Sequence, residues 1–220
     1  MTTKIEFIGD PTCPFCYLGY SRFALARLEF DADVLDVSIS PFFINPDLPS
    51  NGLEYQQYLL ARFGDQKTIA AELVPFLKGC EEDKIPLGLD KIKVMPNTLN
   101  AQRLIHWAAE IGADEELFRA LQTAHFVGGF DIGNDAVLRA RAEAIGMDGR
   151  TIMNMFATDR DEVNIKETYK DFLKHGLKEV PTWVIGGTYV VTGVQSFSFW
   201  RNVIGEIDEK GRDNARRNLN

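Results

Sequence analysis

Hydrophobic and polar residues follow three patterns near the start of the chain, and each pattern predicts one element of secondary structure. Residues 5–8 form a short, largely apolar run that ends at two turn formers, which is typical of a β-strand. Leu18, Leu25 and Leu28 follow at helical spacing and predict a helix with these leucines on one face. Residues 35–40 alternate between apolar and polar side chains, which predicts a second strand with one polar face or edge.

The middle of the chain is expected to be helical almost throughout. Six helices are predicted, mostly behind N-capping residues, with starts near Leu53, Asp65, Thr98, Asp114, Asn134 and Asp148. A further helix at residues 160–175 returns the chain to a β-rich segment. We therefore predict an α/β domain built from residues 1–45 and 160–220, with an all-helical subdomain, residues 46–159, inserted into it.

Two β-rich runs near the end of the chain flank Gly186-Gly187, and this pattern predicts a hairpin with a tight primed turn. Pro181 opens the first run, at a position where proline costs no ladder hydrogen bond. Residues 196–207 are predicted to form a closing helix. The polar and charged residues 208–220 are predicted to be a frayed tail.

Composition and charge narrow the range of partners. The chain has 220 residues, with 45% hydrophobic and 25% charged residues, which is typical of a globular protein with a sizeable core. Its net charge of −8 argues against a nucleic acid or an anionic membrane as a partner. No apolar run approaches the ~18 residues of a membrane-spanning helix, so no membrane span is expected.

The candidate chemistry lies in Cys13-Pro14-Phe15-Cys16, between the first predicted strand and the helix expected over residues 17–29. Proline suits the first helical turn, so the helix is expected to begin within this motif. The free N–H groups and the dipole of a helix start stabilise a thiolate there. A second cysteine three residues later can close onto the first, which predicts thiol–disulfide exchange.

Two other interpretations of the motif are less favoured. A Cys-x-x-Cys pair is half of a zinc site, but four ligands are needed. The remaining candidates form no second close pair: Cys80, His106, His125 and His175. Two inert core cysteines are the other alternative, and the strand–helix junction with its interposed proline argues against it. No metal site is therefore expected.

The motif and the β-rich end of the chain together resemble a known family. A Cys-Pro-x-Cys at a strand–helix junction, with a distant Val180-Pro181-Thr182 before a hairpin, is similar to thioredoxin-fold proteins. More narrowly, the chain resembles the cytoplasmic DsbA-like oxidoreductases of the FrnE type, which are related to 2-hydroxychromene-2-carboxylate isomerases and kappa-class glutathione transferases. The resemblance covers residues 10–19, 41–46, 97–98, 117–132 and 180–195. Glu179 and Trp183 depart from it, where glycine and phenylalanine are more usual.

The resemblance implies a thioredoxin-like α/β fold and a thiol–disulfide oxidoreductase that acts on protein or small thiol substrates. Cys13, the more exposed cysteine, would form a mixed disulfide with the substrate, and Cys16 would resolve it. Val180 and Pro181 would lie opposite, joined by a cis peptide bond, with the Val180 backbone hydrogen-bonding an extended partner. Pro14 and Phe15 are further candidate substrate contacts. His125, at the edge of the subdomain, is another candidate, but a satisfied core histidine is the favoured interpretation of this residue.

A glutathione-dependent transferase or isomerase on the same fold is the main alternative. Such relatives usually keep a serine at the first position of the motif, so the pair Cys13 and Cys16 favours redox chemistry. A non-catalytic chaperone or binding module is a third possibility. No bound cofactor is expected to be required, with glutathione a candidate reductant or co-substrate. The motif leaves no room before it for a secretory signal, so a cytoplasmic location is expected.

Overall fold

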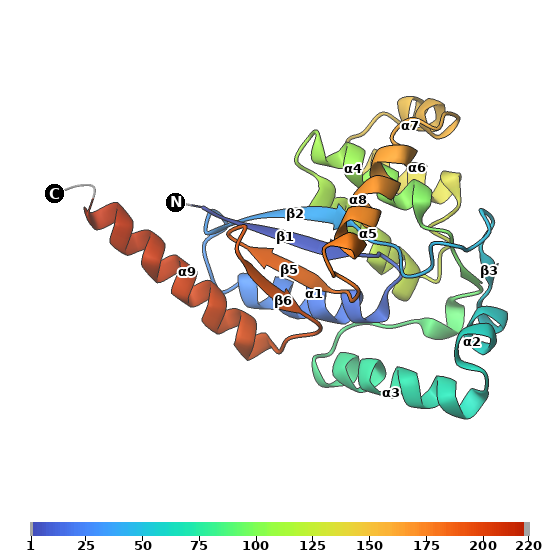
Figure 1. The fold of residues 1–220 in the computed structure, drawn as a ribbon, viewed down its shortest axis with the longest axis horizontal. Helices are drawn as coiled ribbons and strands as arrows, with labels where there is room; N and C mark the ends of the chain where they lie inside the picture. Colours follow the sequence, from blue (N-terminus) through green and yellow to red (C-terminus); the bar gives the residue numbers. More distant parts are fainter. Residues whose placement is uncertain (1, 218–220) are drawn as a thin grey trace.

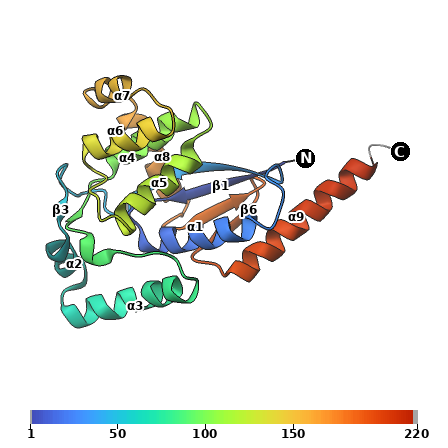
Figure 2. The same cartoon turned by 180° about the vertical axis from the view of Figure 1, so that it is seen from behind.

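The computed structural model describes residues 2–217 and contains a four-stranded mixed sheet in the order β2-β1-β5-β6. β1 (Thr3–Gly9) pairs in parallel with β2 (Leu35–Pro41) and antiparallel with β5 (Thr182–Ile185), which forms a hairpin with β6 (Tyr189–Thr192). Figures 1 and 2 show α1 (Pro14–Arg27) along one face of the sheet and α8 (Glu162–Lys174) across the other. The predicted α/β class with inserted helices is therefore present.

Helix α1 begins at Pro14, inside the cysteine motif, and its apolar face differs from the predicted one. Leu18 is buried, but Leu25 is 42% and Leu28 is 80% exposed, so the predicted leucine face is wrong. The buried side is instead formed by Cys16, Tyr17, Leu18, Gly19, Tyr20, Phe23 and Ala26. The larger rings of Tyr20 and Phe23 turn towards the sheet, because they bury more apolar area there than the leucines would.

An aromatic cluster on the Trp183 ring joins the sheet to its helices. Trp183 of β5 lies 4.4 Å from Phe7 of β1, and 4.5 and 5.5 Å from Phe23 and Tyr20 of α1, between ring centroids. Trp200, in α9 (Phe197–Arg217), lies 4.7 Å from the same ring. All five side chains are buried, so this cluster is the centre of the main hydrophobic core.

Residues 46–159 are mainly helical, as predicted, and most of the predicted helix starts are confirmed; because these residues also hold a short two-stranded sheet, they are not all-helical. The helices of this segment are α2 (Tyr55–Phe63), α3 (Gln66–Glu82), α4 (Leu99–Ala109), α5 (Asp114–Phe126), α6 (Asp135–Ala144) and α7 (Gly149–Phe156). Asp65, Asn134 and Asp148 cap α3, α6 and α7 with their side chains, as N-cap chemistry requires. The subdomain boundaries at residues 46 and 159 stay a prediction.

The helix predicted to start near Leu53 is wrong at its first residues. Leu53–Glu54 forms a short strand, β3, which pairs antiparallel with β4 (Val94–Met95). The Glu54 side chain accepts a hydrogen bond of 2.8 Å from the N–H of Gln57, so α2 begins only at Tyr55. Pairing with β4, which is distant in the chain, thus replaces the first helical turn that the local sequence pattern favours.

Helices α2 and α3 rest on α1 through a second hydrophobic cluster, which includes Tyr17, Leu18, Phe76 and Phe126. The rings of Tyr17 and Phe126 are stacked 4.7 Å apart. A Cβ atom on Gly79 of α3 would lie 2.6 Å from Cδ2 of Leu18, so glycine permits the close approach of the two helices. This contact places α3 beside the start of α1, where the cysteines are.

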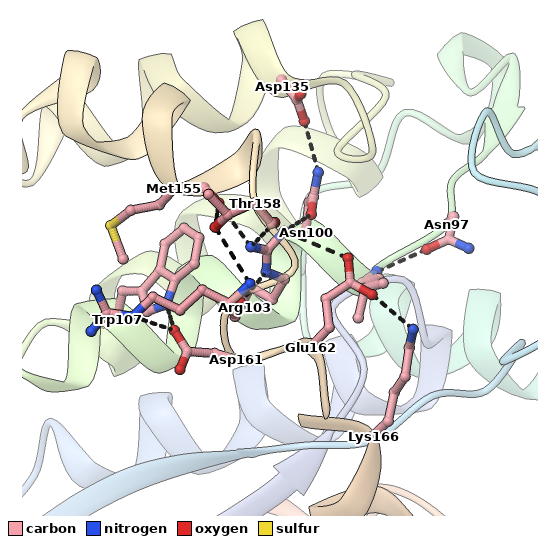
Figure 3. A network of polar contacts seen from close by, with 12 residues as sticks. Asn97, Asn100, Arg103, Trp107, Asp135, Met155, Thr158, Asp161, Glu162 and Lys166 are labelled. Carbon is pink, nitrogen blue, oxygen red and sulfur yellow. Dashed lines mark hydrogen bonds and ion pairs between the residues drawn. The ribbon is translucent and has the colours of Figure 1, made fainter. Parts of the chain in front are cut away.

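The segment that leads from the subdomain into α8 is held by the buried guanidinium group of Arg103 (Figure 3). Arg103 donates hydrogen bonds of 2.7–3.1 Å to the backbone carbonyl oxygens of Met155, Thr158 and Arg160, and one of 2.8 Å to the side chain of Asn100. Carbonyl groups at the C-terminal end of a helix have no intrahelical partner. Arg103 therefore supplies the hydrogen bonds that the carbonyl groups at and after the end of α7 would otherwise lack.

A second set of contacts fixes the same segment. Trp107 donates a hydrogen bond of 2.9 Å from Nε1 to the carboxylate of Asp161, which adopts a left-handed conformation (φ +66°). The Arg103 guanidinium lies 5.0 Å from the Trp107 ring, within the range of a cation–π contact. Asp161 and Glu162 then begin α8, and Glu162 pairs with Lys166 (2.9 Å; Figure 3). α8 is therefore anchored at its start.

The end of the chain differs from the sequence prediction. Gly186 and Gly187 have φ values of +59° and +70°, as a primed turn requires, but Ile185 pairs with Tyr189, so three residues connect the strands. α9 continues to Arg217, so the predicted tail from residue 208 is wrong; residues 218–220 lie outside the described part of the chain. Among the described helices, none has both the length and the apolarity needed to cross a membrane.

Candidate active site

The two cysteines of the motif occupy different depths at the start of α1. Cys13 is the N-cap residue, and its sulfur accepts a hydrogen bond of 3.3 Å from the N–H of Cys16. Pro14 takes the first helical position, where its missing N–H costs nothing. Cys13 is 5% exposed and Cys16 is 0% exposed, and both are free thiols. The helix start therefore directs an N–H donor at the outer sulfur.

The surroundings of Cys16 keep its sulfur protonated. Burial raises the pKa of the Cys16 thiol well above its ordinary value, and its hydrogen bond and like-charge interaction with Cys13 raise the pKa further. The charge of Asp10 acts in the same direction. A Cβ atom on Gly9 would lie 3.1 Å from the Cys16 sulfur, so glycine lets β1 approach it closely. Cys16 is thus a buried hydrogen donor beneath Cys13.

Asp10 anchors the loop that carries Cys13, a role that the sequence pattern did not reveal. Its buried carboxylate accepts hydrogen bonds from the N–H and hydroxyl of Thr12 (2.8 and 2.7 Å), the N–H of Ile44 (3.1 Å) and the hydroxyl of Thr98 (3.2 Å). The Asp10 carbonyl accepts from the N–H of Cys13 (3.1 Å). Burial raises the pKa of Asp10, and these hydrogen bonds oppose the rise. One carboxylate therefore joins three segments of the chain behind the motif.

Replacing Asp10 by asparagine is expected to destabilise the fold by about 1.5–3 kcal/mol, the range for hydrogen bonds to a charged group. The amide NH₂ of asparagine would face the N–H of Ile44 or of Thr12, which leaves a buried donor without an acceptor. Urea unfolding of Asp10→Asn measures the loss. Asp36→Asn, at an exposed position of β2, is the control. Equal stability of the two variants would contradict the anchoring role.

Val180 and Pro181 lie across from the cysteine motif. Their peptide bond is cis in the structure, as the sequence predicts. A Cβ atom on Gly19 of α1 would lie 3.0 Å from Cγ of Pro181, so the proline packs directly on the helix that Cys13 begins. The Pro181 carbonyl accepts a hydrogen bond of 2.8 Å from the N–H of Gly193, which fixes the loop after β6 beside it.

A groove of about 700 Å³ brings these residues together. Cys13, Pro14 and Phe15 share it with Val180 and Pro181. One wall comes from the loop after β2 and from α8, and the other from α2 and α3; the aromatic side chains of these walls are Phe42, Phe43, Tyr55, Tyr58, Phe63, Phe76 and Tyr169. Charged groups from Arg62, Glu72, Lys178 and Glu179 also line it. The groove therefore combines an apolar lining with one reachable thiol.

Comparison with known proteins decides the family. Residues 4–205 match the model of the DSBA-like thioredoxin domain. The chain belongs to this family.

This DSBA-like protein is similar to known proteins over nearly its whole length. The uncharacterised protein YwbO of Bacillus subtilis is 26% identical over 96% of this chain and 100% of its own. A probable DsbA oxidoreductase from Streptomyces coelicolor superposes with a TM-score of 0.81 at 21% identity, over 93% of this chain and 89% of its own. The cytosolic disulfide reductase DsbM of Pseudomonas aeruginosa, solved with GSH, superposes with a TM-score of 0.63 at 16% identity, over 97% of this chain and 99% of its own. The thioredoxin-like fold is therefore shown.

His125 does not line the groove of the DSBA-like protein, so its predicted position at the substrate site is wrong. It is 1% exposed in α5, with its ring 4.8 Å from that of Phe126. Burial lowers its pKa to about 4, opposed in part by the backbone of Phe130. Neither ring nitrogen has a hydrogen-bond partner among the described residues. His125 therefore lies in the core, as the favoured interpretation predicts, but its ring nitrogens lack the hydrogen bonds expected of a core histidine.

The buried His125 is expected to make the protein less stable as the pH is lowered. The unfolded chain binds a proton as the pH drops through ~6.5, but the folded chain does so only near pH 4, so folding loses roughly 3 kcal/mol across this window. His125→Leu should remove this part of the loss, as measured by urea unfolding at pH 7, 5 and 4. The same change at the exposed His106 is the control. An unchanged pH slope in His125→Leu would contradict the assignment.

Cys80 lies outside the groove, away from Cys13 and Cys16. It is 1% exposed in α3, and burial raises its pKa to about 12. A thiol with this pKa carries almost no thiolate near neutral pH, so it is a poor nucleophile. Within residues 2–217, no group of three or more His, Cys, Asp or Glu side chains is placed to hold a metal ion.

Proposed function

We propose that this DSBA-like protein exchanges disulfides with thiol substrates through Cys13 and Cys16. One observation carries the proposal: the Cys13 sulfur lies at a helix start and at the groove surface, while Cys16 is buried directly beneath it. This difference in depth supports an attack by the outer sulfur on the substrate and a resolving role for the inner sulfur. The family and fold support the general class of thiol–disulfide oxidoreductase or isomerase.

The reaction can be written with every electron and proton accounted for. The Cys13 thiolate attacks one sulfur of a substrate disulfide, and that bond breaks as the Cys13–substrate disulfide forms. The departing substrate thiolate takes a proton. Cys16 then loses its proton to solvent or to the second leaving thiolate and attacks the Cys13 sulfur. The Cys13–Cys16 disulfide forms as the Cys13–substrate disulfide breaks, which releases the substrate as a dithiol. Two electrons have moved from the protein to the substrate, and two external thiols return them as they are oxidised to their own disulfide.

The groove supplies binding for this chemistry. Val180 would present its backbone N–H and C=O to an extended substrate, and the aromatic walls would hold apolar side chains near the reacting sulfur. Phe15 is 37% exposed beside Cys13, so it would contact whatever thiol approaches.

A glutathione-dependent activity is the second candidate. Two cations at the groove, Arg62 and Lys178, could pair with the carboxylates of glutathione. The structurally similar DsbM was solved with GSH. In this role glutathione would bind as a co-substrate of a transferase or isomerase reaction, or serve as the reductant that returns electrons to Cys13.

The two candidates are separated by the Cys13→Ser variant. The redox proposal expects that disulfide reduction is lost in this variant and that calorimetry detects no saturable glutathione binding. Arg62→Ala in the same background is the matched control for a binding signal from the groove. Tight glutathione binding to Cys13→Ser, reduced by Arg62→Ala, would support the transferase or isomerase instead. Full disulfide reduction by Cys13→Ser would contradict the proposed function.

A further inference from the structure

The two edge strands of the sheet, β2 and β6, differ in how far their outer backbone groups are blocked from pairing with another strand. On β2, the N–H of Ile39 donates a hydrogen bond of 2.8 Å to the carboxylate of Asp114, and Pro41 at the end of the strand has no N–H to offer. β6 forms the opposite edge and pairs with β5 on its inner side (Figure 1). Neither charge nor proline occurs in its four residues, Tyr189–Thr192.

The register identifies which backbone groups of β6 point away from the sheet. The N–H of Gly193 donates a hydrogen bond to the carbonyl of Pro181. Along an antiparallel pair of strands, every second residue is hydrogen-bonded to the partner strand, so Val191 and Tyr189 also direct their backbone groups towards β5. The N–H and C=O of Val190 therefore point outward, as does the N–H of Thr192. The Thr192 carbonyl accepts 2.9 Å from the Gln195 side chain, so this group has a partner of its own. The open part of the edge centres on Val190.

The exposed side chains of this edge, Tyr189, Val190 and Thr192, carry no charge. Tyr189 is 73% and Val190 is 62% exposed. No charged residue occurs between Glu179 and Arg201, in a chain of net charge −8 with 25% charged residues. A charged side chain placed against this edge would lose hydration without gaining an opposite charge, so an uncharged extended segment is the favoured partner.

The edge is continuous with the catalytic groove. Gly193 and Val194, which directly follow β6, line the groove together with Cys13 and Pro181. A strand added to β6 would lie three inter-strand spacings, or about 14 Å, from β1. Val190 is level with Glu6 in the register, and Cys13 follows the end of β1 at Gly9, so the path also runs about 10 Å along the strands. A segment paired with Val190 could thus carry a cysteine roughly six residues away to the Cys13 sulfur.

We propose that β6 pairs with an extended, uncharged segment of a polypeptide substrate and thereby delivers that substrate's disulfide to Cys13. The inference rests on the proposed thiol–disulfide exchange and adds a substrate class to it: polypeptides in preference to small disulfides. Backbone pairing at Val190 provides affinity, as in other cases of β-strand addition, and the groove provides the reaction. Glutathione disulfide is too short to span both sites, so the edge does not act on it.

The chain offers a matched pair of variants for the test. Val190 on β6 and Val163 on α8 are both 62% exposed, and only Val190 lies on the sheet edge. Lysine at an edge strand opposes pairing, so Val190→Lys blocks strand addition while Val163→Lys introduces the same charge elsewhere. Val190→Pro removes the outward N–H itself and provides a second variant.

Reduction of insulin and of glutathione disulfide is measured for each variant. We expect Val190→Lys and Val190→Pro to lower kcat/KM for insulin roughly tenfold, through KM, with glutathione disulfide unaffected and Val163→Lys like the wild type. Unchanged insulin reduction in Val190→Lys, equal losses on both substrates, or a wild-type dimer that this variant dissociates would overturn the inference. A wild type that reduces neither substrate would instead reject the proposed function, on which the inference rests.

Discussion

Cys13→Ser is expected to lower disulfide reduction by at least about 10³-fold, because it removes the nucleophile at the groove surface. Cys16→Ser should stop turnover at the next step. Its Cys13 sulfur can still attack a substrate, but the buried partner that would resolve the mixed disulfide is gone. Turnover assays measure the first effect, and mass spectrometry of the protein after reaction with a peptide disulfide measures the second. Adducts should accumulate on Cys16→Ser alone.

Cys80→Ser is the control for both cysteine variants, since Cys80 is buried in α3 outside the groove and should leave turnover unchanged. Full turnover by Cys16→Ser would contradict the role of Cys16 as the resolving cysteine. Adducts that accumulate on Cys16 of the Cys13→Ser variant would reverse the assigned roles. A large loss in Cys80→Ser would show that a third thiol takes part.

Trp183→Ala is expected to destabilise the protein by about 3–5 kcal/mol, the range for loss of a fully buried large aromatic side chain. Trp183 contacts rings of the neighbouring strand and of the helices that cover it, including Phe7 of β1 and Trp200 of α9. Its removal would leave a cavity at the point where the sheet meets α1 and α9. Urea unfolding, followed by circular dichroism, measures the change in free energy.

Trp183→Phe should cost much less, about 1 kcal/mol, because most ring contacts remain. The Trp183 indole N–H has no hydrogen-bond partner among the described residues, so phenylalanine leaves no polar group unpaired. Tyr189→Ala, on the exposed side of the adjacent strand, is the control and should change stability by less than about 0.5 kcal/mol. A loss in Trp183→Ala no larger than in Tyr189→Ala would contradict the proposed core.

Local sequence signals predict the parts of the fold that depend on local chemistry. N-caps such as Asp65 and Asn134 begin helices where predicted, because their side chains bond to the first N–H groups of the same helix. Gly186 and Gly187 take the positive φ values that a primed turn needs. The cysteine motif likewise begins its helix through proline and a capping sulfur, both within four residues.

Features set by distant contacts were missed or mispredicted. The buried face of α1 follows the aromatic core, so Leu25 and Leu28 remain exposed although their spacing is helical. α9 continues past residue 207, where the Arg212 guanidinium lies 3.8 Å from the carboxylate of Asp31, a residue far away in the chain. Asp10 could be found only by its partners, which lie up to 88 residues away in the chain.

Titration of the cysteines in glutathione redox buffers, read by mass spectrometry after thiol alkylation, tests the central claim most directly. The account predicts one reversible two-electron transition that links Cys13 to Cys16 and leaves Cys80 alkylated at every ratio. The same transition should be absent from Cys13→Ser and from Cys16→Ser. Persistence of both thiols at the most oxidising ratio, or a disulfide that includes Cys80, would contradict a Cys13–Cys16 redox couple.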